Sequence, residues 1–194
     1  MTRGWMNWYH CTLTCYGQWL RGDPRGWRER NHRLHVEGDY KSPPEPTAYN
    51  KAIFRQSQKI LKFDPVEFTM EERGHVCVYV LRSLEIQQID VRAIAVGAKH
   101  THVLINCPRD NPKAVIGKAK TNVWMQLVNG GEKLKTSTDA RPLWAVGSHA
   151  EPITEKDHFI NAFWYILEHR LEGAWTWCFK CERDGRALCK HLRA

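Results

Sequence analysis

The fold is decided by residues 94–106, which read IAVGAKHTHVLIN. Two short apolar runs flank a Gly-Ala-Lys turn, and this pattern predicts two adjacent strands. Successive side chains of a strand point to opposite faces of its sheet, so His100 and His102 share one face and Thr101 points to the other. Two imidazoles spaced in this way can bind one divalent ion, or they can be a pair of surface histidines on a half-exposed strand.

The composition is that of an ordinary globular protein. The chain of 194 residues is 42% hydrophobic and 26% charged, which is enough for one domain with a sizeable core. Lys and Arg (29) outnumber Asp and Glu (21), and the net charge of +8 favours a polyanionic partner. No apolar run has the length of a membrane span, no signal peptide is recognisable, and the seven cysteines are an odd number. We therefore expect a cytoplasmic protein with reduced thiols and no membrane partner.

The remaining pattern predicts an α+β fold. Residues 8–16 are aromatic and β-branched and predict a first strand, whereas residues 69–72 form a capping box that should open a helix ending near residue 86. An amphipathic helix is predicted over residues 113–128, a strand within residues 142–150, and a last helix over residues 154–171. The order strand, helix, strand, strand, helix, strand, helix predicts an antiparallel sheet with the helices packed on one face.

The segment of residues 17–46 is punctuated by glycine and proline and rich in arginine and histidine. It is either a solvated loop or a basic loop that binds a phosphate backbone, and we favour the second interpretation. Residues 48–62, which follow it, predict a weak helix. The candidate DNA-binding side chains from this loop and from the helix over residues 113–128 are Arg21, Arg25, Arg28, Lys113, Lys118 and Lys120.

The last predicted helix carries a tyrosine away from its apolar stripe. At about 100° per residue, the stripe consists of Ile160, Phe163, Trp164, Leu167 and Leu171. Tyr165 and His169 fall on the opposite side, one turn apart, together with His158, Asn161 and Glu172. If this helix docks against the strand of His100 and His102, His169 becomes a third metal ligand.

Such a set of residues predicts phosphodiester chemistry. A divalent ion held by three histidines can polarise a phosphodiester, and the Tyr165 hydroxyl can attack its phosphorus to give a 5′-phosphotyrosine and a free 3′-hydroxyl. A phenol has a pKa of about 10, so the metal or a nearby base would have to activate it. The alternative is an interfacial tyrosine whose hydroxyl lies in water.

The C-terminal residues 173–194 form a short, basic, cysteine-rich tail after a main domain of residues 1–172. The spacing C-x2-C-x7-C-x-H offers three cysteines and one histidine, a set that can bind structural Zn²⁺. The alternative is free thiols in a basic tail. The residues concerned are Cys178, Cys181, Cys189 and His191.

Taken together, these features resemble the HUH superfamily of single-strand transposases with one catalytic tyrosine, which includes the REP-associated tyrosine transposases. The resemblance extends from about residue 9 to residue 173 and is carried by the order and spacing of its parts. Two positions depart from the family pattern: Thr101 stands where a bulky apolar residue is usual, and His169 stands where Gln or Asn is often found. The matching parts are the first strand leading into GQWLRGDPRG (17–26), HTHVLI (100–105), the helix of residues 115–128, PLW (142–144) with GS (147–148), and YILEH (165–169).

The resemblance implies a ferredoxin-like sheet with the HUH motif on a central strand and the tyrosine on a C-terminal helix. It also implies Mg²⁺ or Mn²⁺ bound by His100, His102 and His169, Tyr165 as the nucleophile, cleavage and rejoining of single-stranded DNA with hairpin-bearing ends, and a homodimer. Three alternatives stay open. They are a domesticated relative that binds or nicks structured single strands, a non-catalytic nucleic-acid-binding module with structural histidines, and a replication initiator or relaxase.

Overall fold

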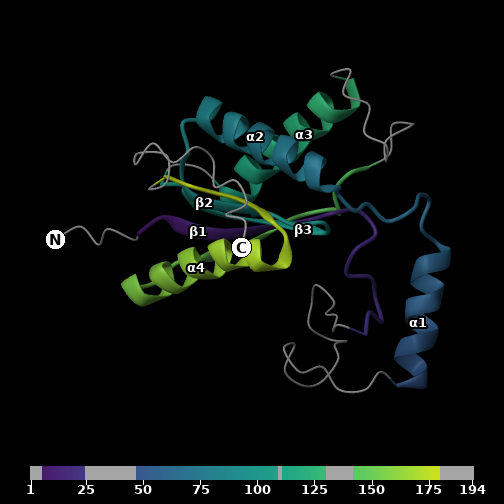
Figure 1. Ribbon diagram of the computed structural model, residues 1–194. Helices are drawn as coiled ribbons and strands as arrows, with labels where there is room; N and C mark the ends of the chain where they lie inside the picture. Colours follow the sequence, from purple (N-terminus) through teal and green to yellow (C-terminus); the bar gives the residue numbers. More distant parts are fainter. Residues whose placement is uncertain (1–5, 25–46, 109–110, 130–141, 180–194) are drawn as a thin grey trace. The chain divides into compact units, whose positions relative to one another are not determined.

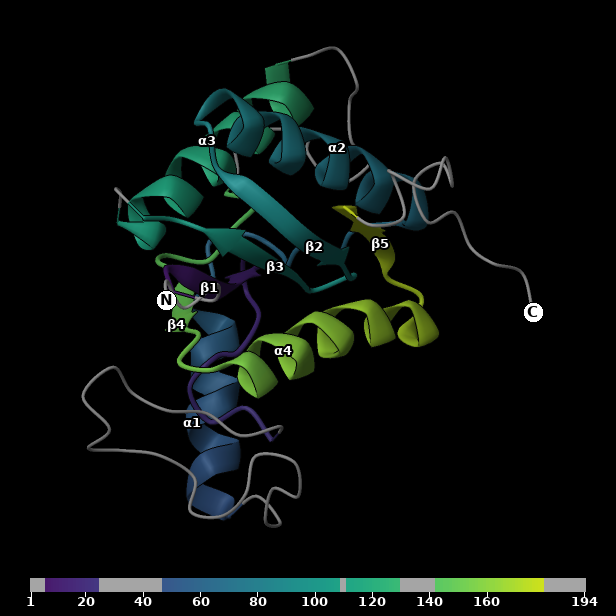
Figure 2. The same cartoon turned by 90° about the vertical axis from the view of Figure 1, so that its left-hand side faces the viewer.

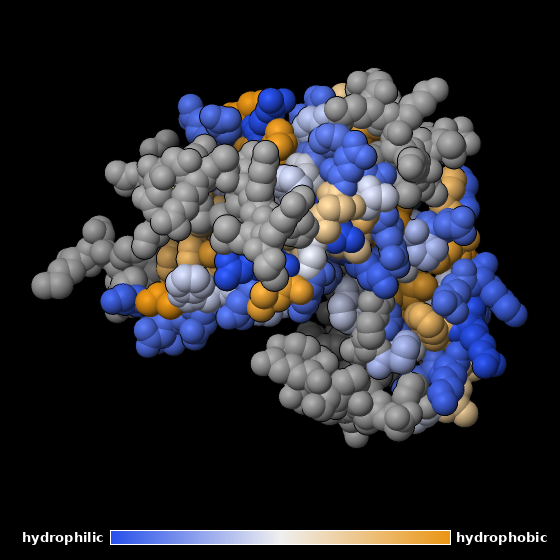
Figure 3. Space-filling view, in the orientation of Figure 1, coloured by the Kyte–Doolittle hydropathy of each residue, from blue (hydrophilic) through white to orange (hydrophobic). Residues whose placement is uncertain are grey.

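The computed structural model describes residues 6–24, 47–108, 111–129 and 142–179 (Figure 1). The chain divides into two compact units, which we call the sheet unit (Met1–Cys15 and Glu67–Ala194) and the helical unit (Tyr16–Val66). Within the described ranges, none of the helices combines the length and apolar character needed to cross a bilayer. On the face shown in Figure 3, hydrophilic residues predominate and hydrophobic ones occur in separate small groups.

The sheet unit contains a five-stranded antiparallel sheet in the order β4-β1-β3-β2-β5. Helices α2 and α3 connect β1 to β2 and β3 to β4, so the first four strands have the split β-α-β arrangement called ferredoxin-like. This confirms the predicted fold class and the position of the two histidines on a central strand. The strands are β1 (Trp8–Thr14), β2 (Asp90–Val96), β3 (His100–Asn106), β4 (His149–Pro152) and β5 (Trp175–Cys178).

Strand pairing determines which side chains share a face of the sheet. Thr12 of β1 and Ala95 of β2 both lie directly opposite His102, and residues opposite each other in an antiparallel pair share a face. The register with β2 shifts between Val91 and Ala93, where the strand bulges. Alternation along β3 therefore places His100, His102 and Leu104 on one face and Thr101, Val103 and Ile105 on the other, as the sequence predicts.

The second face, that of Thr101, is covered by α2 (Met70–Ile86) and α3 (Pro112–Asn129) (Figures 1 and 2). The predicted capping box opens α2: the Glu72 N–H donates to Thr69 Oγ1 at 3.3 Å, and the Thr69 N–H donates to Glu72 Oε2 at 2.7 Å. Both helices turn an apolar side to the sheet. Their buried hydrophobic residues are Val76, Cys77, Val80 and Leu84 of α2, and Val115, Ile116, Ala119, Val123 and Leu127 of α3.

Helix α4 (Lys156–Glu168), continued by the 3-10 helix η1 (His169–Glu172), lies on the opposite face, the one that carries the two histidines (Figure 2). The expectation of helices on one face thus holds for α2 and α3, while α4 covers the other face. It buries Ala162, Ile166 and Leu167. They join an apolar cluster with Trp8, Ala93, Ala95, Leu104, Ile153, Ala174 and Cys178, against which Phe159 and Phe163 pack.

The buried side of α4 is rotated from the predicted apolar stripe. Ile160 and Trp164 are 38% and 55% exposed, and Leu171 is 82% exposed, whereas Ala162 is buried. Two alanines, Ala93 and Ala95, form the part of β2 that faces α4. The small Ala162 of α4 packs in the same cluster. Leu171 lies outside the regular periodicity because α4 ends at Glu168 and the chain continues as η1.

The helical unit contains α1 (Ala48–Lys59), which begins at an N-cap, Thr47, whose hydroxyl accepts a hydrogen bond from the Asn50 N–H. Gly22 has a φ of +80°, and a Cβ at this position would lie 2.4 Å from the Asn50 carbonyl oxygen. Only glycine allows the chain to approach α1 this closely. Residues 25–46, most of the predicted basic loop, lie outside the described residues.

Two parts of the sheet unit differ from the sequence-based expectation. Residues 173–178, expected as the start of the tail, contain β5, which pairs with β2 at the edge of the sheet. In the predicted strand of residues 142–150, Trp144 makes only an isolated bridge to Cys15, and β4 begins at His149. Lys120 holds this intervening segment: its ammonium group donates to the Ala145 and Gly147 carbonyls, at 2.6 Å each.

Candidate metal centre

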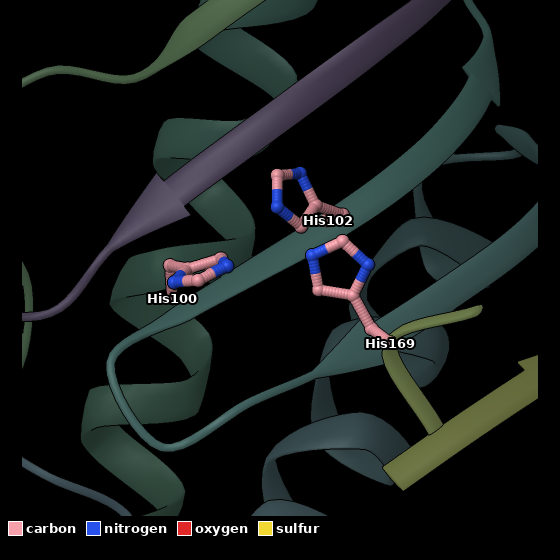
Figure 4. Close-up of side chains that lie close together, drawn as sticks. All are labelled: His100, His102 and His169. Atoms are coloured by element: carbon pink, nitrogen blue, oxygen red, sulfur yellow. The ribbon is translucent and has the colours of Figure 1, made fainter. Parts of the chain in front are cut away.

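Three histidines from two distant segments meet on the α4 face of the sheet. His100 and His102 extend from β3, and His169 stands at the junction of α4 and η1 (Figure 4). One ring nitrogen of each histidine lies within 4.8 Å of the others. The ring centroid of His102 is 4.7 Å from that of His100 and 4.6 Å from that of His169. The sequence predicted these three residues as a metal-binding set, and the structure brings them together.

The end of α4 fixes the His169 ring. Its Nδ1 lies 2.8 Å from the carbonyl oxygen of Tyr165, and because a carbonyl can only accept, Nδ1 carries the proton. The lone pair of His169 is therefore on Nε2, the nitrogen that faces His102 in Figure 4. Gly173, with a φ of +81°, then ends η1 and turns the chain into β5.

His102 is the most enclosed of the three histidines. It is 6% exposed, and its Nδ1 lies 3.0 Å from His10 Nε2 and 3.2 Å from Thr12 Oγ1, both on β1. Burial, strengthened by the nearby imidazoles of His100, His10 and His169, lowers the pKa of His102 from 6.5 to about 2. His102 is thus neutral at physiological pH, and a neutral imidazole is the form that binds metal.

The residues present fit a divalent metal ion. Three imidazoles from rigid elements form a common ligand set of catalytic sites, in which a further position is left for water or substrate. Imidazole nitrogen suits transition ions, whereas Mg²⁺ prefers oxygen ligands and keeps several waters. The three imidazole nitrogens could therefore hold one divalent ion.

Tyr165 lies at the edge of the histidine cluster. Its ring centroid is 4.7 Å from that of His169, 5.3 Å from that of His102 and 5.7 Å from that of His10. The side chain is 48% exposed, so a large substrate can reach it. The structure therefore places a solvent-accessible phenol beside three buried or half-buried imidazoles; the helical periodicity predicted only that Tyr165 and His169 lie one turn apart on the same side of the helix.

The predicted DNA-binding residues fall into three groups. Lys113 and Lys118 are exposed on α3, and Arg21 is exposed in the helical unit. Lys120 is different, because its ammonium group is bound to two backbone carbonyls and burial lowers its pKa, so it serves the packing of residues 142–148. Arg25 and Arg28 lie outside the described residues.

The predicted zinc ligands are represented by one residue in the described part of the chain. Cys178 is the last residue of β5, is 2% exposed, and packs in the apolar cluster beneath α4. The zinc set that includes Cys178 stays a prediction. Cys181, Cys189 and His191 lie outside the described residues.

Sequence reasoning missed the β1 side of the site, His10 and Thr12. Both were read only as part of a first strand. The spacing of His10 and Thr12, at positions i and i+2 of a strand, indicates that they share a face. Which residues of a neighbouring strand they contact depends on the pairing register, which the sequence does not display.

Comparison with known proteins finds a likeness among solved structures. No family model matches the chain, and no curated protein matches it either. Among solved structures, the chain is similar to a REP-associated tyrosine transposase bound to a REP hairpin, with 12% sequence identity, a TM-score of 0.47, and coverage of 97% of this chain and 85% of the other. Values this low carry no functional argument, so the case for function rests on the residues of the site.

Proposed function

We propose that this protein is a DNA strand transferase of the tyrosine HUH type, a transposase that cleaves and rejoins single-stranded DNA. One observation carries the proposal: three imidazoles converge beside an accessible tyrosine on the same face of the sheet. The proposed metal site and the proposed nucleophile are in direct contact, because the ring of Tyr165 packs against that of His169. A histidine cluster with a purely structural role would not require an accessible tyrosine beside it.

In the proposed reaction, the Tyr165 oxygen attacks a phosphorus of the DNA backbone. The new bond joins the phenolic oxygen to phosphorus, the bond from phosphorus to the 3′-oxygen breaks, the phenol loses its proton, and the 3′-oxygen gains one. The products are a 5′-phosphotyrosine and a free 3′-hydroxyl. Attack by a 3′-hydroxyl on the phosphotyrosine reverses these steps and rejoins a strand.

His100, His102 and His169 would hold the divalent ion in this reaction. When bound, Mn²⁺ or Mg²⁺ supplies charge that offsets the negative charge developing on the phosphate oxygens. Burial keeps His102 unprotonated, and the Tyr165 carbonyl keeps the Nε2 lone pair of His169 available. These contacts therefore keep the lone pairs of His102 and His169 available to an ion.

DNA binding is the remaining part of the proposal. The net charge of +8 favours a phosphate backbone, and Lys113, Lys118 and Arg21 are exposed cations. We assign Arg25 and Arg28 to the same role, and we propose hairpin-bearing ends as the substrate, a homodimer as the assembly and the cytoplasm as the location.

A covalent-adduct assay tests the function directly. The full chain is mixed with labelled single-stranded hairpins from its flanking DNA and Mn²⁺, and the products are separated on a denaturing gel. We expect a labelled protein band that requires the metal and disappears in Tyr165→Phe. Tyr79→Phe, which removes a hydroxyl from α2 on the other face of the sheet, is the matched control and should leave the band intact.

Two outcomes would contradict the proposal. Adduct formation by Tyr165→Phe would show that another residue is the nucleophile. Tight hairpin binding without any adduct would identify a non-catalytic binder of structured single strands.

A further inference from the structure

We propose that His10 and Thr12 of β1 are positioning residues of the metal centre, which hold the His102 ring so that Nε2 is its ligand atom. The inference deepens the proposed function and rests on it. Neither residue belongs to the three-histidine set, and neither would touch the ion through the atoms that contact His102.

The geometry of the sheet brings these residues to one atom. Thr12 lies directly opposite His102, and His10 lies two residues away along β1, opposite Leu104. Diagonal neighbours on the same face of an antiparallel pair are within reach of long or aromatic side chains. Both therefore meet His102 Nδ1: the Nε2 of His10 at 3.0 Å and the hydroxyl of Thr12 at 3.2 Å.

These contacts affect which nitrogen of His102 carries its proton. A neutral imidazole carries one N–H, so His102 can ligate through Nε2 only while Nδ1 holds the proton. That N–H then donates to His10 Nε2 or to Thr12 Oγ1. The reverse arrangement, in which His10 Nε2–H donates to His102 Nδ1, would put the His102 proton on Nε2 and remove the lone pair that a metal needs.

His169 and His102 differ in how their tautomers are determined. The partner of His169 is a carbonyl oxygen, which accepts only, so one tautomer is fixed by the backbone. The partners of His102 can each accept or donate, so the ligand-competent tautomer depends on two side chains.

Metal affinity provides the first test. Mn²⁺ binding to the full chain is measured by isothermal titration calorimetry, without DNA. We expect His10→Phe, which keeps a ring but has no acceptor, and Thr12→Val, which keeps the shape without the hydroxyl, to weaken binding, and the double variant to lose about 10-fold to 100-fold. His10→Gln retains an acceptor near the Nε2 position and should restore most of the affinity.

Controls separate positioning from folding. His75→Phe removes an imidazole from α2, on the opposite face of the sheet, and should leave Mn²⁺ affinity unchanged. Circular dichroism and thermal melting establish that each variant is folded. Unchanged Mn²⁺ affinity in folded His10→Phe and Thr12→Val together would overturn the proposal.

The tautomer provides a second test that needs neither metal nor DNA. In protein with ¹⁵N-labelled histidine, two-bond ¹⁵N–¹H correlations identify which nitrogen of His102 carries the proton. We expect the Nδ1–H form in the wild type and a mixture in the double variant, and a predominant Nε2–H form in the wild type would overturn the positioning role. Absence of Mn²⁺ binding in the wild type would overturn it too, whereas intact binding without a DNA adduct would overturn only the proposed function.

Discussion

The two faces of β3 are buried almost equally, but their polar side chains differ in whether they have hydrogen-bond partners. Thr101, on the face under α2 and α3, is fully buried, and its hydroxyl has no hydrogen-bond partner among the described residues. His102, on the face under α4, is 6% exposed, and its Nδ1 has two partners. One face of β3 thus packs in the core, where the unpartnered Thr101 hydroxyl costs free energy. The other face carries an organised set of imidazoles.

The largest expected effect comes from the α4 face. His102→Ala removes the central one of the three proposed ligands, so we expect Mn²⁺ affinity to fall beyond the roughly 100-fold that loss of an outer partner can cause, and the DNA adduct to disappear. Calorimetric titration and the adduct gel measure the two effects. Retention of tight Mn²⁺ binding in His102→Ala would mean that the metal site is not built on β3.

The next effect comes from the α2/α3 face. Ile105 is fully buried, and Ile105→Ala should lower the free energy of unfolding by about 2–5 kcal/mol through lost burial and the cavity left behind. Mn²⁺ affinity of the folded protein should not change, because Ile105 points away from the histidines. Urea denaturation measures the stability. If Ile105→Ala instead weakened Mn²⁺ binding without lowering the free energy of unfolding, the assignment of stability to one face and metal binding to the other would be wrong.

Acid should act on the α4 face. Burial lowers the pKa of His10 to about 4 and that of His102 further, whereas an unfolded histidine has a pKa of 6.5. The unfolded chain therefore binds protons first as the pH falls below 6.5, and the metal-free protein should lose stability from there down to about 4, by up to about 3 kcal/mol for His10.

Urea midpoints measured from neutral pH to about 4 test this acid sensitivity. His10→Gln carries no titratable ring, so the slope of stability against pH should be shallower than in the wild type. An equal slope in the two proteins would show that other groups, such as carboxylates, cause the acid sensitivity.

The smallest effect is a gain in stability. Thr101→Val keeps the side-chain shape and removes the unpartnered hydroxyl, so we expect the free energy of unfolding to rise by about 1 kcal/mol. Mn²⁺ affinity should be unchanged, although Thr101 lies between two proposed ligands in sequence. A loss of stability in Thr101→Val would indicate that the hydroxyl has a partner in solution.

The sequence predicted the parts of the fold that depend on local patterns. The turn at residues 97–99, the alternation of His100, Thr101 and His102, and the capping box at Thr69 all follow from neighbours within a few residues, and all are confirmed. The α+β class followed from the order of these elements. Tyr165 and His169 could be paired because they lie one turn apart on one helix.

The remaining features depend on contacts between distant segments. The order of the strands, and with it the contact of His10 with His102, is set by pairing that alternation alone does not specify. β5 is only four residues long and contains two tryptophans and a cysteine, so its sequence predicted part of the C-terminal tail and not a strand. The rotation of α4, which exposes Trp164, follows from the small side chains Ala93 and Ala95 across the interface.

The hydrogen bond from His169 to the Tyr165 carbonyl has a consequence for local unfolding. It joins the proposed nucleophile and one proposed ligand within a single turn of α4. If α4 detaches from the sheet in a partial opening, both groups leave together, and amide hydrogen exchange in α4 should slow when metal binds, since binding stabilises only the docked state. The opening would thereby remove the tyrosine and the third proposed ligand together, and would not leave the tyrosine beside the two histidines that remain on β3.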